Sequence, residues 1–436
     1  MTSKFQQRLE WLNVWGGGTL MGMLAADVVI GSYNAGVSPF KPSLFTPLVF
    51  VFCVTVGLLS RPRFCLAALL LLALPVYRLL DIVILARHNV TGLDSMAMSC
   101  ARLLLVQIAM IAVLSAPSGL RAMRWAAILT ILLTSGSSIA EFLNLVKFSS
   151  IPGRFSGFNG HPNSPPIVIC QCLGLCFALV KNFRWNMAII AAGIPGVALT
   201  YGRSGMVIFA FVVGIYILMN ARRNLGFLIM CTYIIVPVMG LGFTLMQQRT
   251  TKGIQQDKNT ADRLEAIYSL DFEKLKSPER IKDLSDAWEA VIEKPVFGHG
   301  AGAASYPWAP HNEYVAMWLE LGAPGLLVYL ATLYIPVLRS LTSGGRAAYA
   351  LLAMLLYSPI AQGRVMDPHF YLTLLTSAYI LWPGRFMFSL RNPPQAVSDI
   401  GHRPQLPGSQ SSITLPFQPQ VLPPGRQTGR YSHPER

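Results

Sequence analysis

The chain contains repeated apolar stretches that are each long enough to cross a membrane. A membrane-spanning helix needs roughly 20 mostly apolar residues, and we find about a dozen such stretches. Overall, 53% of the 436 residues are hydrophobic and only 13% are charged, which is typical of a membrane protein rather than of a large soluble core. The pattern therefore predicts an all-α, polytopic integral membrane protein. The predicted spans lie near residues 14–31, 43–60, 64–86, 97–115, 123–143, 165–181, 185–200, 204–220, 225–246, 313–338, 345–363 and 369–388.

The basic residues predict how the chain crosses the membrane. A formal charge of +15 would suggest a nucleic-acid partner in a soluble protein, but here the basic residues fall at helix ends. With the N-terminus in the cytoplasm, basic residues gather in alternate loops on one side, as the positive-inside rule requires. Both termini are then cytoplasmic, and a long polar loop faces the bacterial periplasm or exterior. The basic residues are Lys4, Arg8, Arg61, Arg63, Arg121, Arg124, Lys181, Arg184, Arg222, Arg223, Arg339 and Arg346.

Three parts of the chain follow from this pattern: a membrane domain at 1–390, a periplasmic loop at 247–310 within it, and a tail at 391–436. The tail is rich in Pro, Gly, Gln and Ser, which predicts a disordered cytoplasmic segment, either a linker or a binding segment for a partner. In the loop, residues 277–295 have helical periodicity. One side of that predicted helix carries Ile281, Leu284, Trp288, Val291 and Ile292.

A polar cluster opens one of the apolar stretches. His311, Asn312 and Glu313 precede the span, and Glu320 lies about two turns deeper on a similar face. Asn312 is a suitable N-cap, and a helix N-terminus with arginines nearby favours a neutral imidazole, the form that accepts a proton. We therefore interpret His311 as a base. Glu320 can orient a partner, pair with an arginine or cap a helix, and the sequence favours none of these.

Several arginines map to the outer side, where the positive-inside rule expects few. Arg203 lies between Gly202 and Ser204-Gly205, where small residues let a ligand approach and a guanidinium can bind phosphate through two hydrogen bonds. Arg154 lies in a glycine-rich outer loop. Arg78 and Arg102 lie within apolar stretches, and Asp81 is one turn from Arg78, so paired structural charges and functional charges remain equally open for these two.

These groups together form an anion site beside a neutral base, which suits a phosphate-bearing, membrane-bound substrate and an activated hydroxyl. The sequence contains no apparent metal-ligand cluster and no phosphate-binding GxxxxGK[ST] loop, so no metal or cofactor is expected. The cysteines of "CQCLGLC" (170–176) lie in a hydrophobic helix, where cysteine is usually a packing residue.

Four segments in order carry a resemblance to a known family: "RFSGFNGHPN" (154–163), "TYGRSG" (200–205), "RIKDLSDAWEAVIEKPVFGHGAG" (280–302) and "HNEYVAMWLELGAPGLLVYL" (311–330). Through them the chain resembles the O-antigen ligase and O-antigen polymerase superfamily of bacterial polysaccharide assembly. The last segment is the most specific, with His-Asn, an aromatic residue and Glu-x-Gly at the family spacing. Gly202 departs from the family pattern, in which relatives often have serine before the arginine.

The resemblance implies a metal-independent membrane glycosyltransferase of GT-C-like helical architecture in the bacterial inner membrane. Its donor is a glycan on undecaprenyl diphosphate, and its acceptor is a hydroxyl on a glycan or a lipid-linked glycan at the periplasmic face. Membrane lipids and polysaccharide assembly proteins are further expected partners, and nucleic acid is not. By similarity, His311 and Glu320 are catalytic and Arg203, Arg280 and Arg154 bind the diphosphate. Supporting residues are Asn312, Glu313, Ser204 and Gly205.

The sequence leaves several alternatives. Polymerisation and ligation of O-antigen or exopolysaccharide both fit, with a slight preference for a polymerase, and some relatives glycosylate proteins. A flippase or transporter of lipid-linked oligosaccharide fits the intramembrane charges but fits the large loop and the neutral histidine less well. A structural subunit of an assembly complex also remains open. The sugar, the linkage, the anomeric outcome and the oligomeric state are not determined.

Overall fold

The computed structural model describes residues 3–60, 62–84, 93–151, 153–221, 224, 226, 278–361, 363–383 and 387–389. The chain divides into two compact units, Met1–Pro393 and Pro394–Arg436, and every described residue lies in the first. Most of the predicted span at 225–246 lies outside the described residues, as do the first part of the predicted loop, 247–277, and the predicted tail at 391–436.

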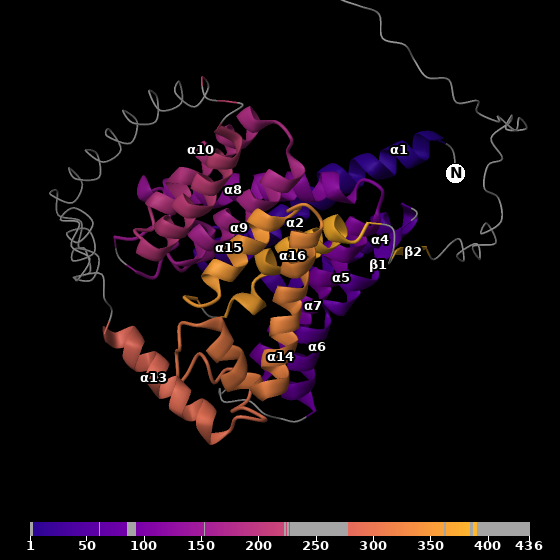
Figure 1. Cartoon of the computed structure of the whole chain (residues 1–436). Coiled ribbons are helices and arrows are strands. Elements are labelled where there is room, and N and C mark those ends of the chain that lie inside the picture. The colour runs from indigo at the N-terminus through magenta and orange to yellow at the C-terminus, as the bar shows by residue number, and fades with distance from the viewer. Residues whose placement is uncertain are drawn as a thin grey trace, which may run out of the picture. The chain divides into compact units, whose positions relative to one another are not determined.

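Helices make up nearly all of the described secondary structure, which confirms the predicted all-α class (Figure 1). Within the described residues, one ladder pairs two short antiparallel strands, β1 (Arg63–Cys65) and β2 (Met387–Ser389). Before residue 160 the helices are α1 (Ser3–Trp11), the π-helix η1 (Leu12–Gly17), α2 (Gly18–Ala25), α3 (Val28–Asn34), α4 (Pro42–Leu59), α5 (Leu66–Leu70), α6 (Ala73–Val83), α7 (Leu93–Ser115), α8 (Gly119–Phe142) and the 3-10 helix η2 (Gly157–Asn159).

The later helices include the longest one in the described part of the chain, α14, which begins just after the polar His311 cluster. In chain order they are α9 (Ser164–Leu179), α10 (Phe183–Ala198), the helix Arg203–Ala221, α13 (Pro278–Glu293), α14 (Glu313–Thr342), α15 (Ala348–Tyr357), the 3-10 helix η4 (Arg364–Met366) and α16 (Pro368–Leu381).

Six helical segments of the described chain are long and apolar enough to cross a membrane, and a bent pair makes a seventh candidate. The pair joins Lys4–Ala25 to Val28–Asn34 with a bend of 51°. The chain is thus a multi-pass membrane protein, while the total of about 12 spans stays a prediction. The six segments are Pro42–Leu59, Leu66–Val83, Met96–Ser115, Gly119–Phe142, Arg203–Ala221 and Glu313–Thr342.

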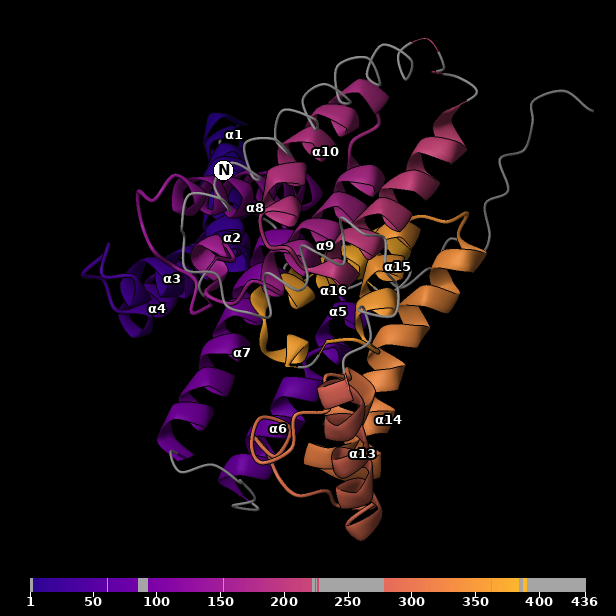
Figure 2. The same cartoon turned by 90° about the vertical axis from the view of Figure 1, so that its left-hand side faces the viewer.

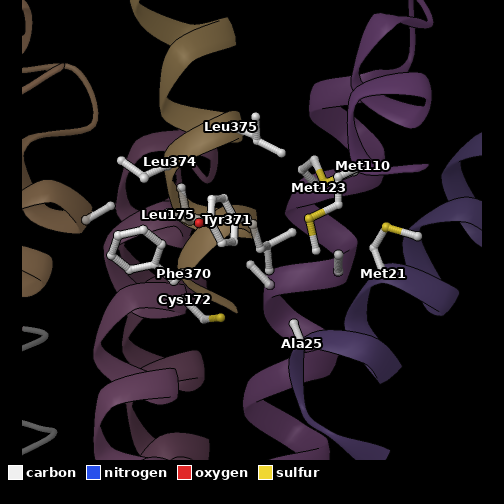
Figure 3. Packing of buried hydrophobic residues seen from close by; sticks show 14 of the residues in the cluster. Met21, Ala25, Met110, Met123, Cys172, Leu175, Phe370, Tyr371, Leu374 and Leu375 are labelled. Atoms are coloured by element: carbon white, nitrogen blue, oxygen red, sulfur yellow. The ribbon is translucent and has the colours of Figure 1, made fainter. Parts of the chain in front are cut away.

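One large hydrophobic cluster joins α2, α7, α8, α9 and α16 (Figure 3). Tyr371 of α16 is fully buried within it, and Cys172 and Cys176 of α9 are also fully buried, in agreement with packing cysteines. Helices in lipid gain little from hydrophobic burial against each other, so close approach through small residues matters. Gly174 is one such residue, because a Cβ there would clash with the backbone of Ala350 where α9 meets α15.

The elements that surround the polar cluster lie at one end of the described helices. Helix α14 packs against α6 and α13, and both views show these three helices side by side (Figure 1, Figure 2). Helix α13 matches the predicted helix at 277–295, but its buried face shares only Val291 with the predicted apolar side. Ala287, Ala290 and Val291 are buried, whereas Ile281 and Ile292 are 67% and 63% exposed. Small alanines face α14 because they let the two helices approach closely.

Candidate active site

A cavity of about 530 Å³ is lined by several of the polar residues that the sequence singles out. Its walls come from α6, α7, α9, the helix Arg203–Ala221, α13, α14 and the end of α15, together with the loops before α9 and α14 and the segment from α15 to η4. The volume lies within the ~300–1,000 Å³ range that is common for small-molecule sites. The charged and polar side chains that line it include Arg78, His161, Asn163, Ser204, Arg280, His311 and Glu320.

His311 enters this cavity from the turn that starts α14. Its backbone is left-handed, with φ of 49°, which is uncommon for a residue with a side chain. The next residue, Asn312, caps the helix as predicted, because its side-chain oxygen accepts hydrogen bonds from the amides of Tyr314 (3.0 Å) and Val315 (3.2 Å). The cap fixes where α14 begins and thereby fixes His311 at the cavity wall.

The surroundings of His311 favour its neutral form. Partial burial lowers the pKa of the imidazole below its ordinary value of 6.5, and the nearby charge of Arg280 lowers it further. Asp283 opposes this shift, since its Oδ2 lies 3.7 Å from His311 Nε2. The net direction is downward, so the imidazole is mostly uncharged at neutral pH and is able to accept a proton.

Helix α13 carries both charged neighbours of His311. Its alanine face packs against Val315, Ala316 and Leu319 of α14, and Trp288 meets Trp318 edge to face at 5.5 Å between ring centroids. This packing holds Arg280 at the cavity wall and Asp283 beside the imidazole. The position of α13 therefore determines which charges lie near His311 and, through them, the pKa of its imidazole.

The loop after α13 is bound into a break in α14. Gly322 interrupts the helix with φ of 70°, and a Cβ there would clash with the carbonyl of Val296. The carbonyls exposed by the break accept hydrogen bonds from the loop: His299 N donates to Leu319 O (2.7 Å) and Gly300 N donates to Glu320 O (3.0 Å). The break at Gly322 therefore fixes the position of the loop against α14, and with it the position of α13.

Glu320 lies at the buried wall of the cavity and forms an ion pair with Arg78 of α6, at 2.6 Å between Oε2 and Nη2. Its Oε1 accepts a hydrogen bond from Gly302 N at 3.0 Å. Of the three interpretations that the sequence left open for Glu320, the structure shows pairing with an arginine. Arg78 is only 6% exposed, and its Nε and Nη1 make no hydrogen bond with the described part of the chain.

The predicted arginine and its neighbours lie at the start of the helix Arg203–Ala221. Ser204 and Gly205 line the cavity, as does Gly202. Arg203 is not among the lining residues, but it lies within electrostatic range of Arg280. Arg203 therefore lies near Arg280, which lines the cavity.

Arg154 does not line the cavity either. It is 4% exposed, its Nε donates to the Thr200 carbonyl (2.7 Å), and its Nη2 donates to Asn163 Oδ1 (2.9 Å). Asn163 does line the cavity. Arg154 thus ties the outer loop to the turn before Arg203. Glu313, by contrast, is fully buried, and its Oε1 accepts from the amide of Val365 (3.4 Å).

Sequence reasoning did not assign three of the residues at this site. His161 and Asn163 line the cavity, but their loop gave only a weak signal. Asp283 is one of several charges of alternating sign on α13. The spacing from Arg280 to Asp283 is nearly one helical turn, which is the available signal that both face the same way.

Residues 187–330 match the family model described as O-antigen ligase, so this range of the chain is similar to O-antigen ligases. The resemblance carried by the sequence motifs is thereby confirmed over this range, which contains Arg203, Arg280, His311 and Glu320 but neither Arg78 nor Arg154. O-antigen ligases are membrane glycosyltransferases of polysaccharide assembly. No curated protein matches the chain.

Proposed function

We propose that the chain transfers a glycan from an undecaprenyl-diphosphate donor to an acceptor hydroxyl at the periplasmic face of the inner membrane. The observation that carries the proposal is that one cavity is lined by His311, Arg280 and the helix start at Ser204 and Gly205, all within the range similar to O-antigen ligases. A neutral base and guanidiniums are the groups that this reaction needs from a protein.

The chemical step assigns one task to His311. The acceptor hydroxyl gives its proton to the neutral imidazole while its oxygen forms a bond to the anomeric carbon of the donor sugar. The bond between that carbon and the diphosphate oxygen breaks, and the electron pair leaves with undecaprenyl diphosphate. Asp283, 3.7 Å away, then stabilises the imidazolium that forms.

The arginines hold the leaving group. Arg280 and Arg203 bind the diphosphate, and Arg78 contributes a third guanidinium from the buried wall. Fixed positive charge placed where negative charge develops lowers the barrier to departure. Arg154 supports them indirectly, because it orients Asn163 and the turn before Arg203. We propose that these guanidiniums suffice without a metal ion, so activity in EDTA equals activity in buffer alone.

The proposal includes the topology predicted from the sequence: about 12 spans, both termini cytoplasmic, and the segment 247–310 in the periplasm. The described half of that segment contains α13, whose Arg280 lies at the cavity wall. The cavity then opens to the side of the membrane where lipid-linked glycans are joined.

Expression of variants in a strain that lacks the gene tests this function. His311→Ala and Arg203→Ala reach the membrane at normal levels, abolish long-chain polymer, and leave lipid-linked glycan on the outer leaflet. The matched control Arg121→Ala keeps full activity, because Arg121 pairs with Glu10 on an exposed surface (2.9 Å). Accumulation on the inner leaflet would support a flippase instead.

The same strains separate the two enzyme types. Loss of a polymerase leaves acceptors that carry a single repeat unit, whereas loss of a ligase leaves acceptors with no repeat unit. We propose the polymerase. A lipopolysaccharide profile without any attached repeat in His311→Ala would assign the ligase reaction.

A further inference from the structure

A second cavity lies beside the first and is not used by the proposed chemistry. It has a volume of about 320 Å³ and lies between α3, α7, η2 and the start of α16. Its polar lining includes the carboxylates of Asp27 and Asp367, the amides of Asn34 and Asn159, and the guanidinium of Arg102.

Two loops separate the two cavities and line both. The segment around η2 presents Phe158, Asn159 and Gly160 to the second cavity, and its continuation presents His161 and Asn163 to the first. The segment around η4 does the same, since Met366 lines both cavities while Asp367 lines only the second. The two cavities therefore adjoin each other at Met366.

The partition between the cavities is firmly held. Glu141 of α8 is 5% exposed, and its carboxylate accepts hydrogen bonds from four backbone amides, those of Phe148, Ser149, Ser156 and Gly157. Hydrogen bonds to a charged group are stronger than those between neutral groups. The loop that bears Phe148, Phe158 and Asn159 is thus a fixed wall rather than an adaptable one.

The charges of the two cavities differ in sign. Arg78 and Arg280 line the first, where Arg78 is balanced by Glu320. In the second, two carboxylates accompany one guanidinium, so a phosphate group would meet net repulsion. The lining suits a ligand that is uncharged and has many hydroxyls, because each hydroxyl both donates and accepts a hydrogen bond.

Two further features of the second cavity fit such a ligand. The side-chain amide of Asn159 has both polar atoms buried, and neither makes a hydrogen bond with the described residues. Asn159 lines the cavity together with Phe148 and Phe158, whose rings meet edge to face at 5.0 Å. A buried amide without a partner is costly unless a ligand or water satisfies it, and aromatic rings offer an apolar surface to the C–H face of a sugar.

We propose that the second cavity binds sugar residues of the glycan that enters or leaves the reaction, with the Asn159 amide as its central hydrogen-bonding group. This subsite rests on the proposed function, because it places sugars next to the site where their diphosphate or hydroxyl reacts. The two cavities divide one elongated substrate by chemistry: phosphate in the cationic cavity and sugar hydroxyls in the mixed one.

Binding measurements on the full chain in lipid nanodiscs test the subsite. The probes are fluorescently labelled oligosaccharides released by mild acid from the host bacterium's own surface polysaccharide, and inorganic pyrophosphate. Asn159→Ala weakens oligosaccharide binding about tenfold, as expected for one lost hydrogen-bonding side chain, and leaves pyrophosphate binding unchanged. Arg280→Ala gives the reverse pattern.

The test includes two more variants, a second change in the lining of the cavity and a control outside it. Asn34→Ala alters an exposed lining residue that packing does not require, so it weakens oligosaccharide binding severalfold in a folded protein. Asn220→Ala is the matched control, because that side chain donates to the Tyr216 carbonyl (2.8 Å) within the helix Arg203–Ala221 and lines neither cavity.

The proposal of a sugar subsite is contradicted if Asn159→Ala and Asn34→Ala both bind oligosaccharide as tightly as the unaltered chain. It is also contradicted if both variants lose pyrophosphate binding to the same extent as oligosaccharide binding. Failure of the proposed function gives a different result. In that case His311→Ala and Arg203→Ala retain long-chain polymer in cells, whatever the binding data show.

Discussion

At the scale of single residues, the chemistry of the site depends on how a few charges are paired. His311 has Arg280 and Asp283 acting on it in opposite directions, and Arg78 and Glu320 neutralise each other at the buried wall. His311 and Arg78 are the groups that the proposed reaction uses, and Asp283 and Glu320 are the carboxylates that pair with them. Removing either carboxylate therefore changes the electrostatic surroundings of its partner and leaves the partner's side chain in place.

The first prediction concerns pH. Because the pKa of His311 lies below 6.5, the neutral base predominates at pH 6.5 and the acidic limb of the activity profile has its midpoint below that value. Asp283 raises this pKa, so Asp283→Asn lowers it further and moves the acidic limb to lower pH. Asp286→Asn, on the same helix and exposed, leaves the limb in place. Initial rates from pH 4.5 to 8 measure both, and a limb that moves upward in Asp283→Asn contradicts the assignment.

The second prediction concerns the buried pair. Arg78→Gln or Glu320→Gln leaves one buried charge uncompensated and costs about 3–5 kcal/mol of stability. The double variant costs less than the sum of the two, because no charge then remains unpaired. Thermal unfolding of the purified chain in detergent measures all three. Additive losses would show that the 2.6 Å contact carries no coupling energy.

At the scale of elements, breaks and loops place the site more than regular helices do. The break at Gly322 receives the loop that follows α13, and the Asn312 cap fixes the start of α14. These two features lie at opposite ends of the helical segment that bears Glu320. Together they set the distance between His311 and the Arg78–Glu320 pair.

The third prediction tests the break. Gly322→Ala forces a side chain into the Val296 carbonyl at a left-handed position, so it displaces the loop and α13 with it. Activity falls by a factor of about 100, as for a 1 Å misplacement of catalytic groups, while membrane insertion is retained. Gly214→Ala is the matched control, because a Cβ there meets nothing within 4 Å. Equal activity of the two variants in the transfer assay would show that the break does not position the site.

At the scale of the whole molecule, the active site is assembled from distant parts of the chain. Apolar length predicts the spans, and the residue pattern together with the family resemblance selects His311 and Arg280, which line the cavity, and Arg203, which lies near Arg280. The Arg78–Glu320 contact joins helices far apart in sequence, and no local pattern indicates it. The same holds for Glu141, whose role depends on amides that a folded loop brings to it. The periodicity of α13 indicates Val291 and Trp288 of its contact with α14, but not the alanines Ala287 and Ala290 that supply the rest of it.

Parts of the chain outside the range matched by the family model also line the two proposed substrate cavities. The region similar to O-antigen ligases spans residues 187–330, whereas the two cavities draw residues from Asp27 to Pro368. The N-terminal helices and α16 therefore supply the second cavity outside the matched range. We therefore expect relatives that catalyse the same reaction on different glycans to differ in sequence in those parts of the chain.

The most direct test is a transfer assay with the purified chain in proteoliposomes, an undecaprenyl-diphosphate-linked glycan as donor, and EDTA present throughout. The unaltered chain and Arg121→Ala release undecaprenyl diphosphate and extend the acceptor at equal rates. His311→Ala and Arg280→Ala are slower by about 100- to 1,000-fold. Transfer by His311→Ala at the unaltered rate, or transfer that appears only when a divalent metal ion is added, would contradict the account of a neutral imidazole working beside fixed guanidiniums.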